Sequence, residues 1–135
     1  MPTLQHSDNA NLVLSDAVRS CKEHRHEFVT PEHILAALLR QEAFAEAVRY
    51  INPEGLEQLG KDIEAFLAGM ERVPETVGYE VTPSSQTDEL MTIAYNQVLS
   101  SSASCLDVPH LVKAMLMTPT RAICWSVRWR ARPRN

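Results

Sequence analysis

The sequence predicts an all-α fold built from two related helical repeats, and three observations lead to this prediction. Apolar residues recur at helical spacing, strong helix-start signals precede them, and the whole pattern returns after a shift of 77 residues without a gap. No segment alternates apolar and polar residues convincingly, and VGYEV at 77–81 comes nearest to a strand. A chain of 135 residues, 44% hydrophobic and 22% charged, has the composition of one foldable domain.

The first repeat, about residues 8–67, is expected to contain four helices. Ser7 or Asp8 can cap the first, and its apolar face is formed by Val13, Leu14, Ala17, Val18 and Cys21. Thr30 followed by Pro31 and Glu32 predicts the start of the second helix. A short third helix is expected across EAFAEAVRYI. The fourth opens with NP at 52–53 and continues to residue 67, and because its apolar residues line one side it should pack against the core.

The second repeat, about residues 86–120, follows an exposed linker at about 68–85. Under the 77-residue shift, Thr30 becomes Asp107 and His33 becomes His110. The five apolar positions of the first helix return as Leu90, Met91, Ala94, Tyr95 and Val98. Because caps and apolar face recur in one register, we expect the two repeats to be related by a pseudo-twofold axis.

The duplication also bears on the histidines of EHRHEFVTPEHILAALL at 23–39. His33 and His110 each lie three residues beyond a predicted N-cap, so a structural bond back to the cap is favoured over catalysis. His24 and His26 could hold a metal ion incidentally if the segment is extended, because side chains two residues apart then point the same way. The alternative is a small metal- or histidine-dependent enzyme centred on residues 24–33. No further Cys/His cluster, Gly-rich phosphate loop or GxSxG motif supports it, so we expect neither an enzyme nor a cofactor.

Charge and cysteine content exclude other classes. Through residue 120 the chain has 8 basic and 17 acidic residues, a poor composition for binding nucleic acid. No apolar run is long enough to cross a membrane, and three scattered cysteines suit a reducing, cytoplasmic location. Residues 121–135 form a basic Arg/Trp tail. The alternatives for this tail are contact with nucleic acid or a membrane. Arg121 replaces the apolar residue expected opposite Phe44, so we favour a non-native end and a second repeat that is truncated or altered at its C-terminal end.

The segment AVRSCKEHRHEFVTPEHILAALL, the duplicated helical pattern and the acidic linker resemble the Clp N-terminal domain family. The EHRHEF spelling is most similar to the ClpA type of Hsp100 unfoldase. The resemblance covers about residues 8–117 and implies an all-helical docking domain that precedes AAA+ ATPase modules. It further implies protein substrates and a ClpS-type adaptor as partners, with Glu27, Glu32 and, at the same acidic edge, Glu23 as exposed adaptor contacts.

Overall fold

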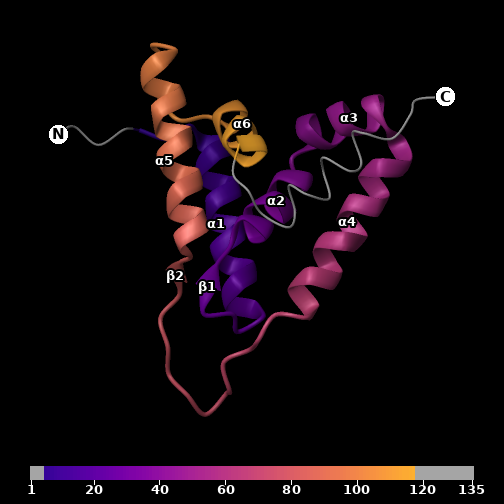
Figure 1. Ribbon diagram of the computed structural model, residues 1–135, viewed down its shortest axis with the longest axis vertical. Coiled ribbons are helices and arrows are strands. Elements are labelled where there is room, and N and C mark those ends of the chain that lie inside the picture. The colour runs from indigo at the N-terminus through magenta and orange to yellow at the C-terminus, as the bar shows by residue number, and fades with distance from the viewer. Residues whose placement is uncertain (1–4, 118–135) are drawn as a thin grey trace.

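The computed structural model describes residues 5–117, and within them the chain is almost wholly helical (Figure 1). The elements in chain order are α1 Asp8–Glu23, β1 Phe28–Val29, α2 Pro31–Leu39, α3 Glu42–Ile51, α4 Pro53–Ala68, β2 Thr82–Pro83, α5 Ser85–Ser100 and α6 Val108–Met117. The all-α prediction is confirmed, and the four helices of the first repeat lie where the sequence placed them. Residues 121–135, interpreted above as a non-native end, lie outside the described part of the chain.

The predicted caps explain where the helices begin. The hydroxyl of Ser7 accepts from the amide of Ala10 at 3.1 Å, and Asn52 does the same for Gly55 at 3.0 Å. Each bond satisfies one of the amides that a helix leaves unpaired in its first turn. Pro31 and Pro53 follow their caps directly, at a position where a missing amide hydrogen costs nothing.

The backbone confirms the duplication and its 77-residue register. Ser84 caps α5 by accepting from Thr87 at 3.2 Å, as Ser7 caps α1. Arg25 and Ser102, which follow α1 and α5, both have left-handed backbone, with φ of 55° and 57°. Residues that are neither glycine, asparagine nor aspartate rarely adopt this conformation, so its recurrence at matched positions is strong evidence for related repeats.

The two repeats exchange backbone hydrogen bonds reciprocally. The amide of Ser84 donates to Val29 at 3.0 Å, while the amide of Ser7 donates to Leu106 at 2.8 Å. β1 pairs with β2 in parallel, and His6 forms the matching parallel bridge with Leu106. Each repeat therefore supplies the strand that the other pairs with, which is the arrangement expected of a pseudo-twofold axis.

These two-residue strands correct the expectation that the chain has none. They are too short to show a period of two, and the strand in the linker is Thr82–Pro83, just after VGYEV. Pro83 can occupy such a strand because it lies on an edge where its missing amide is not needed.

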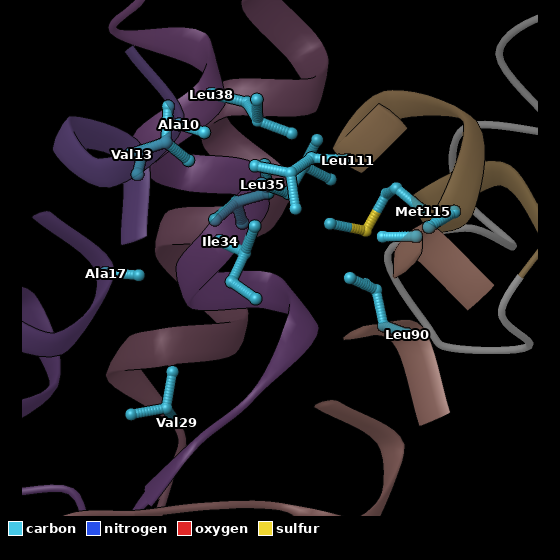
Figure 2. Packing of buried hydrophobic residues seen from close by; sticks show 14 of the residues in the cluster. Ala10, Val13, Ala17, Val29, Ile34, Leu35, Leu38, Leu90, Leu111 and Met115 are labelled. Atoms are coloured by element: carbon cyan, nitrogen blue, oxygen red, sulfur yellow. The ribbon is translucent and has the colours of Figure 1, made fainter. Parts of the chain in front are cut away.

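The core lies between the repeats, where α1 packs on α2 and α5 on α6 (Figures 1 and 2). Ile34 and Leu35 of α2 face Leu90, Leu111 and Met115 of the second repeat in Figure 2. α4 packs on α2 from the other side, and its buried residues are Gly55, Leu59, Ile63 and Leu67. The two repeats thus share one core, so neither is expected to fold alone.

Candidate functional site

The loop between α1 and α2 carries the histidines and carboxylates singled out from the sequence. α1 ends at Glu23, His24 is its C-cap, and Arg25 turns the chain with a φ of 55°. The amide of His26 then donates back to Cys21 at 2.9 Å, which directs the His26 side chain into the protein, where it is fully buried. The condition for a shared metal ion, an extended segment from His24 to His26, is therefore not met, because a left-handed turn at Arg25 separates them.

His26 joins His33 in a buried hydrogen-bonded chain. His33 Nδ1 accepts from the amide of Thr30 at 2.9 Å, so its proton lies on Nε2. That Nε2 donates to His26 Nδ1 at 3.0 Å, which leaves the proton of His26 on its own Nε2. The predicted structural role of His33 is confirmed, and in addition the bond ties the start of α2 to the end of α1.

Both imidazoles are held neutral. Burial, with smaller contributions from positive charge on His26 and His24, lowers the pKa of His33 from 6.5 to about 4. Burial likewise lowers the pKa of His26, helped by positive charge on His24 and Arg72. A second proton on His26 would sit on Nδ1 and face the N–H of His33 across 3.0 Å. A second proton on His33 would sit on Nδ1 and face the amide N–H of Thr30 across 2.9 Å, so the pair stays neutral at neutral pH.

The second repeat has the bond between histidine and the N-cap amide but lacks a buried histidine pair. His110 Nδ1 accepts from the amide of Asp107 at 2.9 Å, as His33 does from Thr30. Ala103 stands at the position that matches His26 and is exposed. The cap bond is thus the shared structural role, and the buried pair is particular to the first repeat.

The histidines do not fit a metal site. His26 uses Nδ1 for His33, and its Nε2 is buried without a hydrogen-bond partner. His24 uses Nδ1 to donate to the carbonyl of Ser20 at 2.8 Å, and its ring stacks on His26 with centroids 5.4 Å apart. Within residues 5–117 no group of three or more His, Cys, Asp or Glu side chains is placed to hold a metal ion.

The three carboxylates of the acidic edge have different environments. Glu23 and Glu27 are exposed, at the last turn of α1 and just before β1. Glu32 is only 2% exposed, in the first turn of α2, so the expectation that it is an exposed contact is wrong. Its predicted place beside the positive end of the helix is correct, and burial of the α2 N-terminus against the rest of the fold covers it.

Arg25 is a functional candidate that the sequence did not reveal. Its guanidinium donates to the carbonyls of Val73, Pro74 and Val77 at 2.9, 2.7 and 2.9 Å, and lies 5.0 Å from the ring centre of Tyr79. One side chain thereby holds the linker against the end of α1. The linker is the loop below β1 in Figure 1. No spacing rule connects Arg25 to residues about fifty positions away, so only the folded structure reveals the contact.

Apolar surface accompanies the acidic loop. Phe28 lies next to Glu27 and is 47% exposed, because Val29 takes the buried side of β1. Its neighbour on β2 is Thr82, which is also exposed. The loop therefore places two carboxylates and one aromatic ring side by side on an ordered backbone.

Comparisons with known proteins agree with this fold. The family model of the Clp repeat (R) N-terminal domain matches residues 5–123. The Hsp104 N-terminal domain from Candida albicans is 17% identical, with a TM-score of 0.80, covering 93% of this chain and 81% of that one. The N-terminal domain of the ClpV1 ATPase from E. coli is 18% identical, with a TM-score of 0.75 and coverages of 94% and 77%. That of ClpD from Arabidopsis thaliana is 12% identical, with a TM-score of 0.63 and coverages of 92% and 83%.

Proposed function

The chain belongs to the Clp repeat N-terminal domain family, and from this premise we propose that it is the protein-docking domain of a ClpA-like AAA+ unfoldase. The observation that carries the proposal is the ordered acidic loop, in which Glu23, Glu27 and Phe28 are exposed on a backbone held by the His26–His33 bond and by Arg25. A backbone that is ordered before binding loses little conformational entropy on association, so it favours binding.

The partner is an adaptor of the ClpS type, which brings protein substrates to ATPase modules of a longer parent protein. The adaptor presents a basic patch to Glu23 and Glu27 and an apolar side chain to Phe28. Glu32 supports the loop from inside rather than touching the adaptor, since only 2% of it is exposed. Carboxylates at the rim of such an interface chiefly raise the association rate and make it sensitive to salt.

The histidine-enzyme alternative has less support. Both ring nitrogens of His33 form hydrogen bonds, one with Thr30 and one with His26, and Nδ1 of His24 forms one with Ser20. A general base needs a nitrogen within reach of a substrate, and the described loop leaves only Nε2 of His24 for that purpose.

None of the described helices has the length and apolarity needed to span a bilayer.

Charge reversal tests the docking proposal. The double substitution Glu23→Lys/Glu27→Lys should weaken binding of a ClpS-type adaptor by on the order of 1–3 kcal/mol, measured by calorimetry. The matched control Glu46→Lys/Glu57→Lys makes the same change in net charge at exposed positions on α3 and α4 and should bind like the parent. Circular dichroism checks that both variants stay helical. Equal affinity of parent and loop variant would reject this surface as the docking site.

A further inference from the structure

A cleft lies on the opposite side of the first repeat from α5, between the end of α1, α2 and α4. Its volume is about 490 Å³, within the range of ligand-binding pockets. Ala36 and Leu39 give it part-exposed apolar walls, while Ile63 and Leu67 line it from almost fully buried positions. Its polar lining includes His24, Arg40, Glu64 and Arg72. Nothing in the docking proposal above uses this cleft.

The charge in the cleft is opposite to that of the body. Through residue 120 acidic residues outnumber basic ones by 17 to 8, yet the cleft is lined by two arginines and one glutamate. Arg40 and Arg72 are both exposed, and no ion pair to either is formed among residues 5–117 within 4.0 Å. Guanidinium groups are weakly hydrated and bind carboxylates in a two-pronged geometry, so this pair favours an anionic ligand.

Gly60 is the second distinctive feature of the cleft. It lies in the interior of α4, where glycine costs about 0.5–1 kcal/mol relative to alanine. Its φ is not positive, and a Cβ added there would meet nothing within 4 Å. Neither backbone strain nor close packing therefore requires glycine, whereas any larger side chain would project into the open space of the cleft and narrow it.

We propose that this cleft binds a short peptide segment that pairs an apolar side chain with a carboxylate. The apolar side chain lies against Ala36 and Leu39, and the carboxylate bonds to Arg40 and Arg72. The missing side chain of Gly60 leaves room for the peptide backbone. A peptide is favoured over a nucleic acid because the surrounding acidic body would repel a chain of phosphates, while one or two carboxylates can be neutralised by the two arginines.

Fluorescence anisotropy with a labelled peptide of alternating leucine and glutamate tests this binding. The double substitution Arg40→Glu/Arg72→Glu should weaken binding by roughly tenfold or more, because it replaces attraction with repulsion. Gly60→Leu should weaken binding comparably by filling the cleft, and it should not unfold α4, since leucine is a stronger helix former than glycine. The control Arg49→Glu/Lys113→Glu makes the same change in net charge outside the cleft and should bind like the parent.

A peptide of alternating leucine and lysine, offered to the parent chain, should not bind. The proposal is overturned if the leucine–glutamate peptide does not bind the parent, if the lysine peptide binds equally well, or if Gly60→Leu binds as tightly as the parent while its circular dichroism remains native. It is also overturned if the Arg49/Lys113 control loses as much affinity as the cleft variant.

Discussion

At the scale of single residues, the buried pair of His26 and His33 makes the free energy of unfolding depend on pH. In the folded protein the pKa of His33 is about 4, and that of His26 is also lowered, whereas both recover about 6.5 on unfolding. Between these values the unfolded chain binds more protons than the folded one. The free energy of unfolding must therefore rise with pH across this window and level off above about 6.5.

The pH dependence gives the first prediction. Lowering the pH from 7 to 4.5 should reduce the free energy of unfolding by on the order of 1–3 kcal/mol through this pair, as measured by urea denaturation. His33→Gln should flatten this dependence, because glutamine at the third helical position still completes the capping box with Thr30 but does not titrate. An unchanged slope in a folded His33→Gln protein would contradict the assignment.

Cys21 supplies the second prediction. It is fully buried beneath the carbonyl of His26, and burial raises its pKa from 9.0 to about 11. Thiolates are the reactive species, so Cys21 should react with a thiol reagent much more slowly than the part-exposed Cys105. In a Cys124→Ser background, mass spectrometry should find Cys105 modified first. Labelling of Cys21 at the same rate would contradict the helix register.

These residues also show which features of the loop could be predicted from the sequence and which could not. The caps and the role of His33 could be predicted because they depend on neighbours within one helical turn. The burial of His26 and Glu32 could not, since it depends on a left-handed turn at Arg25 and on how α2 packs. Arginine carries no signal for a positive φ, unlike glycine or asparagine, so the sequence did not indicate the turn at Arg25.

At the scale of elements, the linker between α4 and α5, called the strap below, is held in place by hydrogen bonds to the first repeat. Arg25 bonds to three of its carbonyls, and the amide of Val73 donates to the carbonyl of Arg25 at 2.7 Å. β2 then joins it to β1. The composition of residues 68–85 predicts an exposed linker, but exposure alone does not distinguish an ordered segment from a flexible one.

Removing the strap's anchor gives the third prediction. Arg25→Ala should increase hydrogen exchange at the amides of Val73 and Val77, because three side-chain bonds that fix this segment are lost. The helices should exchange as in the parent. Arg25→Lys should restore only part of the protection, since one ammonium cannot reproduce the planar fork of the guanidinium. Unchanged exchange in Arg25→Ala would show that the strap is held by other contacts.

At the scale of the whole molecule, the two repeats form one core through reciprocal contacts. The 77-residue register was readable because apolar faces and caps repeat together. The exchange of strand pairing between Ser84 and Val29, and between Ser7 and Leu106, was not readable. Its strands are two residues long or shorter and pair across more than fifty positions, so neither periodicity nor spacing reveals them. The repeat boundaries and the nature of residues 121–135 stay predictions.

The fourth prediction tests the central claim that the acidic loop is the docking surface. Amide chemical shifts of the chain are recorded with and without a ClpS-type adaptor. The account predicts changes concentrated at residues 22–29 and in β2 Thr82–Pro83, the segments that surround Glu23, Glu27 and Phe28. These changes should weaken as salt is raised, because rim carboxylates are screened. Changes confined to α5 and α6, or none at an adaptor concentration that saturates binding, would contradict the account.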